Sequence, residues 1–308
     1  MAWKLLRKPL ELQDILLNIL LFALGAGLAV YLRVQIRWGV YLIGQMTVLS
    51  LHLAAVYTRA YFTLDAEWMA ELAEFFKLYR AKRVGEELTV DRPQFIYLLV
   101  ALPFLTIFAF SLLSLFQQGL FSAPLLLILL LNFALWGAYA VPPLLLGASP
   151  YRDLTLGTIL LILLPAFSLL LQRGELVDLL VIFALPLLLV YLALRIALDL
   201  EALPEDENRN HKTMLTALGW ERGMRLHNLF LLLAYTALGV SSIFFRLPWE
   251  LLWPCLISLP FALVQIVQMI QIHGGAKPNW KLLRFNARTT FFLLLYLILF
   301  SLWVTPWA

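Results

Sequence analysis

The stretch LTLGTILLILLPAFSLLLQRGELVDLLVIFALPLLLVYLALRIALDL, residues 154–200, contains two apolar runs separated by a short polar turn. Each run has the length of about 20 residues that an α-helix needs to cross the hydrocarbon core of a bilayer. The apolar residues are continuous rather than alternating, which is not the pattern of half-buried strands. We therefore predict two membrane-spanning helices, at residues 154–172 and 176–198.

Seven further runs of the same kind occur along the chain. In the bilayer core only a helix satisfies the backbone of such a run internally, so all nine runs predict helices. The sequence thus predicts an all-α integral membrane bundle of about nine transmembrane helices, forming a single domain over residues 1–308. The seven further spans are predicted at residues 14–33, 38–58, 94–116, 119–141, 226–245, 250–272 and 287–306.

Composition agrees with a membrane protein and excludes other classes. The 308 residues are 62% hydrophobic and 14% charged, whereas a soluble domain carries about 25% charged residues. The single cysteine, Cys255, excludes a disulfide framework or a cysteine-based metal site. A net charge of +4, scattered along the chain, does not favour nucleic acid as a partner and fits contact with anionic membrane lipids.

The distribution of Lys and Arg predicts the orientation. A cytoplasmic N-terminus leaves only Arg33, Arg37, Arg173 and Arg246 outside, and the positive-inside rule favours this arrangement. We therefore predict a protein of the cell (plasma) membrane whose N-terminus and long polar loops face the cytoplasm. The two long loops, residues 59–93 and 199–225, are expected to form a cap over a cavity between the helices.

Acidic residues cluster just after the second and the sixth predicted span. Within each cluster two carboxylates lie four residues apart, a spacing that places them on one face of a helix. Two carboxylate clusters at one membrane face suit Mg²⁺, and nearby bases suit phosphate oxygens. Ordinary solvated loops at a helix–water boundary would show the same spacing. The acids are Asp65, Glu67, Glu71 and Glu74 in the first cluster and Asp199, Glu201, Glu205 and Asp206 in the second; the bases are Arg59, Arg80, Lys82, Arg83, Arg209 and Lys212.

Several segments carry a resemblance to a known family. HKTMLTALG, residues 211–219, resembles the end of the second Asp-rich signature of the UbiA superfamily of intramembrane prenyltransferases. YAVPPLLL, residues 139–146, resembles the family's segment after the fourth helix, and AAVYTRAYFTLDA, residues 54–66, resembles the region of the first signature. The expected nine helices and the two large loops agree with this resemblance.

The chain departs from the family pattern at the acids. In the first signature Ala60 and Thr63 stand where the two aspartates are expected, and Val56 and Arg59 replace asparagines. In the second signature an ungapped alignment keeps Asp206 but places Ala202 at the earlier acid. A one-residue insertion would instead match Glu201 and Glu205. The first signature is therefore largely dismantled and the second is partly intact.

The resemblance implies transfer of an isoprenoid chain from a prenyl diphosphate to a lipophilic acceptor, such as an aromatic quinone precursor or a tetrapyrrole, with Mg²⁺ as cofactor. It assigns catalysis to Asp65, Glu205 and Asp206. It assigns substrate binding to Arg59, Arg83, Tyr139, Arg209 and Lys212. The metal ligands would be Asp65, Glu67, Glu71, Glu201, Glu205 and Asp206.

Two other functions stay open. The replaced acids suggest a catalytically degenerate protein that binds a lipid, quinone or pigment, or that is a structural subunit of a larger membrane complex. A transporter is less favoured, because the chain shows no internal repeat.

Polar residues within the spans have local interpretations too. Gln265, Gln268 and Gln271 either face a ligand cavity or join helices by hydrogen bonds, and the second interpretation is favoured. His52 is either functional or packed, and Arg195 is spaced to pair with Asp199.

Overall fold

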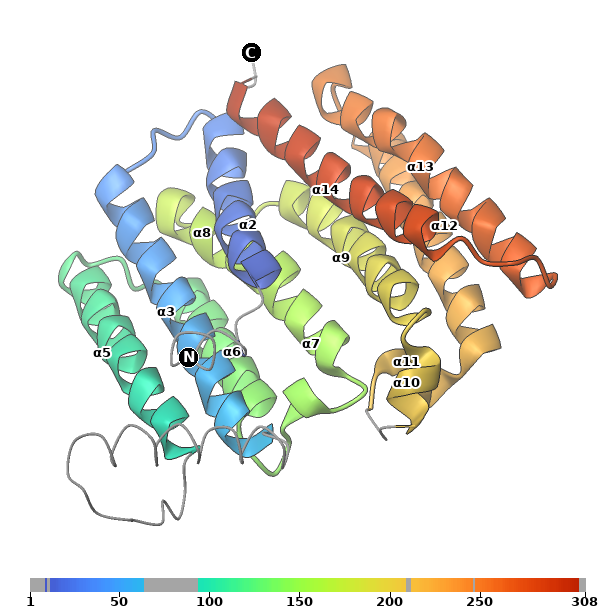
Figure 1. Ribbon diagram of the computed structural model, residues 1–308. Helices are drawn as coiled ribbons and strands as arrows, with labels where there is room; N and C mark the ends of the chain where they lie inside the picture. Colours follow the sequence, from blue (N-terminus) through green and yellow to red (C-terminus); the bar gives the residue numbers. More distant parts are fainter. Residues whose placement is uncertain (1–8, 10–11, 64–93, 209–211, 246, 305–308) are drawn as a thin grey trace, which may run out of the picture.

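The structure, a computed structural model, describes residue 9 and residues 12–63, 94–208, 212–245 and 247–304, and every regular element in them is a helix (Figure 1). Nine segments of this described part are long and apolar enough to cross a membrane, which confirms the predicted fold class. They are α2 (Leu12–Tyr31), α3 (Trp38–Thr63), α5 (Phe95–Gln117), α6 (Ala123–Ala140), the continuous segment of α7 (Arg152–Thr158), η2 (Ile159–Leu163) and α8 (Leu164–Arg173), α9 (Asp178–Asp199), α12 (Trp220–Phe244), α13 (Trp249–His273) and α14 (Trp280–Val304). The short helices are η1 (Leu146–Ala148), α10 (Leu203–Asn208) and α11 (Met214–Leu218).

Three helices extend beyond their predicted boundaries at the predicted inner side. Helix α3 ends at Thr63 rather than 58, α12 begins at Trp220 rather than 226, and α14 begins at Trp280 rather than 287. The predicted loop 59–93 therefore starts with helical residues, and the predicted loop 199–225 ends with them. The physical reason is that backbone hydrogen bonds continue a helix into its polar turns, whereas the apolar run marks only the part inside the hydrocarbon.

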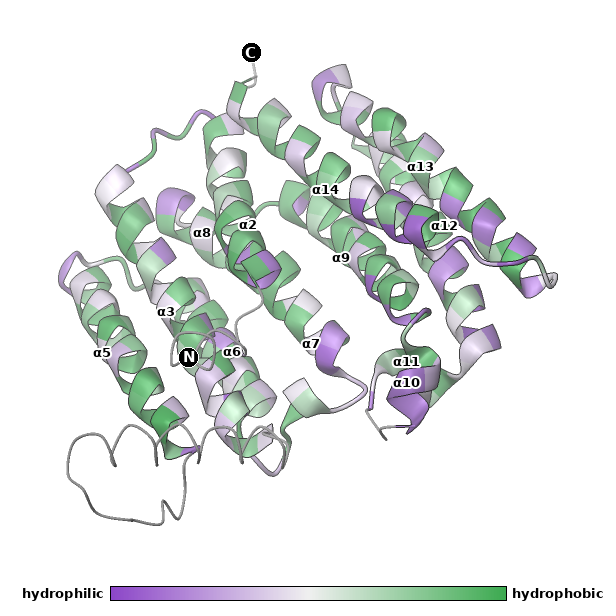
Figure 2. Cartoon of the chain, viewed as in Figure 1, coloured by the Kyte–Doolittle hydropathy of each residue, from purple (hydrophilic) through white to green (hydrophobic). Residues whose placement is uncertain are grey.

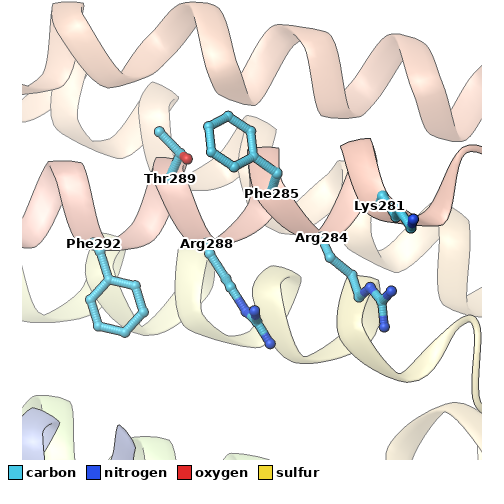
Figure 3. A pocket seen from close by; sticks show the side chains of 6 residues that line it. All are labelled: Lys281, Arg284, Phe285, Arg288, Thr289 and Phe292. Atoms are coloured by element: carbon cyan, nitrogen blue, oxygen red, sulfur yellow. The ribbon is translucent and has the colours of Figure 1, made fainter.

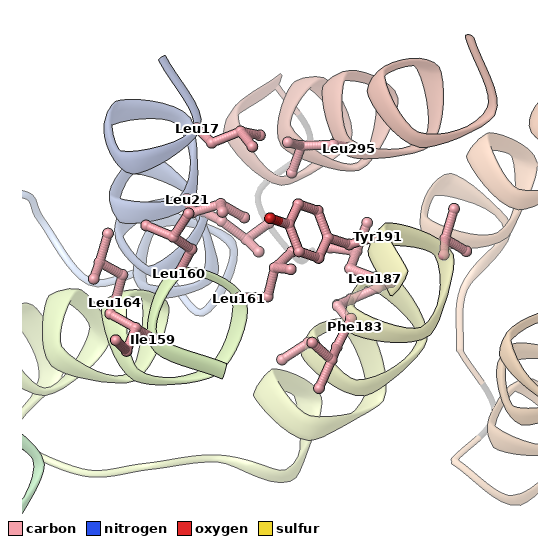
Figure 4. Close-up of a cluster of buried hydrophobic side chains, with 14 of the residues drawn as sticks. Leu17, Leu21, Ile159, Leu160, Leu161, Leu164, Phe183, Leu187, Tyr191 and Leu295 are labelled. Carbon is pink, nitrogen blue, oxygen red and sulfur yellow. The ribbon is translucent and has the colours of Figure 1, made fainter. Parts of the chain in front are cut away.

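The core lies where four segments meet. Helix α2 packs against α8 and α14, and α9 packs against α12 and α14. Side chains from α2, η2, α9 and α14 fill the space between these segments (Figure 4). The segments Arg152–Arg173 and Asp178–Asp199 are mostly buried, while α5, α12 and α13 turn most of their surface outward. The bundle thus has a central core and flanking helices with apolar outer faces.

Polar side chains join the helices inside this core. The Gln265 amide of α13 donates to the Thr290 hydroxyl and the Asn286 carbonyl of α14, and its carbonyl oxygen lies 3.4 Å from Nε2 of His227 on α12. Gln268 Oε1 accepts from Asn286, as expected of a residue that joins helices. The exposed Gln271 lines a groove between α13 and α14 instead.

A second group of polar contacts joins α2, α3 and α6. His52 is 1% exposed, contacts Asn18 through Nδ1 at 3.3 Å and stacks on Trp136 at 4.6 Å between ring centroids. The sequence left open whether His52 is a functional residue or a packed one, and the structure shows the packed arrangement.

One end of the bundle collects polar residues. There α3 and α9 end, α7 and α12 begin, and α10 and α11 lie between them (Figure 1). Hydrophilic residues gather at the start of α7 and at α10, whereas apolar residues dominate the long helices (Figure 2). We call this end the predicted inner end, because it carries the segments that the distribution of Lys and Arg assigns to the cytoplasm.

Candidate functional site

Two predicted substrate-binding residues meet at the predicted inner end of α3 and α6. Arg59 donates from Nη1 to the Tyr139 hydroxyl at 2.6 Å and to the Gly147 carbonyl oxygen at 3.4 Å. Gly147 fits this contact because it has no Cβ: a Cβ there would lie 2.5 Å from Cδ of Arg59 and 2.8 Å from the Tyr139 carbonyl oxygen. Arg59 therefore joins the last turn of α3 to the turn after α6, and its substrate role stays a prediction.

The positions of the expected first acids lie on the same turn of α3. Ala60 is buried and packs with Tyr57, Tyr97 and Ala101, and the Thr63 hydroxyl donates to the Arg59 carbonyl oxygen. Neither side chain offers the carboxylate that the family pattern has at its position. The predicted residues Asp65, Glu67, Glu71, Arg83 and Arg209 lie outside the described residues.

The second acidic cluster spans the turn between α9 and α10. Glu201 Oε2 forms an ion pair with Arg284 Nη1 of α14 at 2.6 Å, and both side chains are half-exposed. Glu205 and Asp206 lie in the first turn of α10, where carboxylates suit the positive end of the helix dipole. Lys212 is exposed just before α11. This segment therefore carries three predicted acidic ligands and a lysine, and one of the acids, Glu201, is already paired.

The segment that resembles the family signature has a clear local structure. Thr213 caps α11: its hydroxyl accepts from the Thr216 backbone N–H at 3.1 Å, and the Thr216 hydroxyl accepts from the Thr213 N–H at 2.8 Å. Gly219 has φ +78°, a backbone conformation that favours glycine, and α12 begins at the next residue. The motif thus builds the turn that leads from α10 and α11 into α12.

The described acids do not by themselves form a metal centre. No group of three or more His, Cys, Asp or Glu side chains within the described ranges is placed to hold a metal ion. Glu201 is paired with Arg284, and the positive charge of this arginine weakens the attraction of the carboxylate for a metal ion. The predicted Mg²⁺ ligands that the structure describes, Glu201, Glu205 and Asp206, therefore form no metal site by themselves.

A buried ion pair lies beside this region. Arg195 Nε of α9 is 2.8 Å from Asp153 Oδ1 at the start of α7, and the side chains are 13% and 4% exposed. The predicted partner of Arg195 was Asp199, on the same helix. The structure corrects this, because Arg195 faces the neighbouring α7. Charge pairing thus fixes α7 against α9 next to the second acidic cluster.

A basic groove that the sequence interpretation missed follows α14 from its first turn. It has a volume of about 580 Å³ and contains three cations and two aromatic rings (Figure 3). Arg284 and Arg288 extend to the same side of α14. The signal was present, since spacings of three and four residues place side chains on one helix face. The lining residues are Lys281, Arg284, Phe285, Arg288, Thr289 and Phe292.

Two other cavities have different chemistry. A groove of about 440 Å³ between α13 and the start of α14 has apolar walls, with Gln268, Gln271, Lys277 and Asn279 among its lining residues. A cavity of about 270 Å³ between α9 and α12 includes Asp178 and Ser241 in an otherwise apolar lining. Neither cavity is lined by a residue of the second acidic cluster.

Fold and hydropathy together indicate an integral membrane protein with the helical fold of a membrane prenyltransferase. One solved structure that the chain resembles comes from work on the biosynthesis of digeranylgeranylglyceryl phosphate synthase in membranes. The TM-score is 0.63 with 14% sequence identity, and the match covers 96% of this chain and 93% of the other. At this identity the likeness shows the fold alone. No protein-family model and no curated protein sequence matches the chain.

Proposed function

We propose that this protein is a UbiA-like prenyltransferase, which binds a prenyl diphosphate at the predicted inner end and transfers the isoprenoid chain to a lipophilic acceptor. The observation that carries this proposal is a fold shared over almost the whole chain with a membrane prenyltransferase. The location of residues 199–208 and 212–219 supports it, since these described parts of the segment that resembles the family's second signature lie at one end of the bundle. The acceptor class, an aromatic quinone precursor or a tetrapyrrole, rests on the sequence resemblance.

The reaction depends more on stabilising the negative charge of the leaving diphosphate than on acid–base catalysis. The allylic carbon–oxygen bond breaks, the diphosphate leaves with the electron pair, and a nucleophilic atom of the acceptor forms the new bond and loses a proton to water. Cations near the diphosphate stabilise the charge that develops on it. Lys212 is the described residue of the predicted site that serves this role, and Arg59 would do so after leaving Tyr139. Mg²⁺, when bound, would supply further positive charge.

The same protein gives a second candidate function, binding without transfer. Two observations favour it: the last turn of α3 carries Ala60 and Thr63 instead of acids, and Glu201 is paired with Arg284. In this case the protein holds an isoprenoid, quinone or pigment, or it is a subunit of a membrane complex.

Turnover by the purified chain separates the two functions. The full-length protein in lipid nanodiscs is incubated with geranylgeranyl diphosphate, Mg²⁺ and a panel of aromatic acceptors. Diphosphate release and prenylated products are measured. The transferase proposal expects both products in equal amounts. It is wrong if the protein binds a non-hydrolysable geranylgeranyl thiolodiphosphate yet releases no diphosphate from the natural substrate, and that result supports the binding function.

A matched pair of variants tests the site. The double change Glu205→Gln and Asp206→Asn is expected to reduce kcat by about a hundredfold or more, because these two carboxylates would help to hold the Mg²⁺ that offsets the charge of the leaving diphosphate. Glu207→Gln is the control, because Glu207 is exposed on the same short helix and has no predicted role. Equal activity of both variants would show that Glu205 and Asp206 of α10 are not part of the active site.

A further inference from the structure

Lys281, Arg284 and Arg288 place three positive charges along one face of α14. Arg284 is paired with Glu201. Lys281 and Arg288 have no carboxylate partner in the part of the chain that the structure describes. Both are exposed. The groove therefore presents two unpaired cations and one shared cation.

Arg288 lies at the start of the apolar part of α14, where the helix enters the hydrocarbon and an unpaired charge is unfavourable. The predicted span begins at residue 287, and the turns from Trp280 up to it are polar helix outside the apolar run. A charged side chain within a span is costly unless it pairs with an anion or extends toward the membrane surface. With no protein carboxylate beside it among the described residues, an anion from the surroundings is the remaining partner.

An apolar stripe continues the groove toward the other end of α14. Phe285, Tyr296 and Phe300 are 61%, 62% and 49% exposed, and Phe292 lines the groove between them. Spacings of seven, four and four residues place these rings on one helix face. Cations at one end and exposed rings along the rest suit an amphiphile with an anionic head and a long hydrocarbon chain.

We propose that the basic groove of α14 binds the phosphate of an anionic glycerophospholipid, whose acyl chain lies along Phe285, Phe292 and Tyr296. Basic pockets at the cytoplasmic side of membrane helices bind anionic headgroups by this mechanism. A lipid fits better than the reacting diphosphate, because the described lining belongs to the outward face of a single helix. A carbocation reaction needs a site that encloses its substrate and excludes water.

The experiment measures lipid selectivity of the purified full-length chain. Delipidated protein in neutral detergent is titrated with dioleoyl phosphatidylglycerol or dioleoyl phosphatidylcholine, and bound lipid is counted by native mass spectrometry. We expect the wild type to prefer phosphatidylglycerol. The variant K281Q/R288Q should bind it roughly 25-fold more weakly, since each basic residue contributes about a factor of five. Arg284 is kept, so that its pair with Glu201 stays intact.

Two controls make the result specific. The variant R222Q/R225Q removes two exposed arginines from the start of α12, at the same end of the bundle, and should bind phosphatidylglycerol within twofold of the wild type. The variant K281R/R288K keeps the charge and should retain binding. Equal binding by K281Q/R288Q and the wild type would overturn the proposal, as would an equal loss in R222Q/R225Q. Displacement of phosphatidylglycerol by geranylgeranyl thiolodiphosphate would assign the groove to the substrate instead. None of these outcomes depends on catalytic activity.

Discussion

Arg195 and Asp153 are two opposite charges held inside the helix bundle, with 2.8 Å between Nε and Oδ1. Removing both from water is costly, and only their close contact offsets that cost. Asp199 follows Arg195 by about one helical turn and ends α9. The pair therefore holds the start of α7 against the last turns of α9, the same turns that lead into the second acidic cluster.

Breaking this pair on one side should destabilise the protein strongly. Arg195→Met leaves the Asp153 carboxylate buried without its partner, and we expect the free energy of unfolding to fall by about 3–5 kcal/mol. Thermal unfolding in detergent is followed with a thiol-reactive dye, because the single cysteine, Cys255, is buried in the folded protein.

The control for this measurement is Arg225→Met, which removes an exposed arginine and should change the free energy of unfolding by less than about 0.5 kcal/mol. The double variant R195M/D153N should regain most of the loss, since no buried charge stays unpaired. If Arg195→Met unfolds at the wild-type temperature, the ion pair does not stabilise the bundle.

Residue pairs were the hardest feature to predict from the sequence. The spacing of Arg195 and Asp199 suggested a pair on one helix, whereas the contact with Asp153 depends on how α7 and α9 are rotated against each other. Lys281, Arg284 and Arg288 were counted only as charges that fix the orientation. Their spacing could have indicated one helix face, but the sequence boundary at 287 placed most of them in a loop.

The segment from α7 through η2 to α8 is one span with an irregular middle. Its π-helical turn, Ile159–Leu163, precedes Pro165. Proline has no backbone N–H to donate to the carbonyl four residues earlier, and a wider turn accommodates this missing bond. The Pro165 carbonyl faces Gly25 of α2, where a Cβ would lie 2.1 Å from that oxygen. The close contact of α2 and α8 thus depends on a glycine.

Gly25→Ala should separate these two helices. The added methyl meets backbone atoms, which cannot move aside as a side chain can, so we expect a loss of about 1–3 kcal/mol in the free energy of unfolding. Gly137→Ala is the matched control in α6, because nothing lies within 4 Å of a Cβ there, and it should stabilise the helix by about 0.5–1 kcal/mol. Both are measured with the same thiol dye. A Gly25→Ala protein as stable as Gly137→Ala would contradict the close contact.

The sequence predicted the nine elements well and their ends less well. Continuous apolar runs are sufficient for the spans, because the bilayer requires a minimum length of apolar helix. Trp220–Arg225 and the first turns of α14 are polar helix outside that length, so hydropathy alone does not detect them. The last turn of α3, with Ala60 and Thr63, is helical as well. The amino-acid sequence of that turn did not decide whether it binds a substrate or only packs against its neighbours.

At the scale of the whole molecule, packing and function occupy different regions. The central contact of α2, η2, α9 and α14 is filled by apolar side chains (Figure 4). Exposed apolar residues on α5, α12 and α13 suit contact with lipid tails. The predicted site residues that the structure describes lie at one end of the bundle. The basic groove on α14 begins at that same end, so both proposals place their anionic ligand at one membrane face.

The orientation in the membrane decides which face that is. With Cys255→Ser as the background, Gln118→Cys places one thiol in the turn between α5 and α6, and Glu207→Cys places one on α10 at the opposite end of the bundle. The positive-inside rule expects a membrane-impermeant maleimide to label Gln118→Cys in intact cells and Glu207→Cys only after permeabilisation. Both native residues are exposed, so accessibility of the thiol does not limit the reaction. Labelling of Glu207→Cys in intact cells, with Gln118→Cys protected, would place the acidic cluster and the basic groove at the outer surface, away from the cytoplasm.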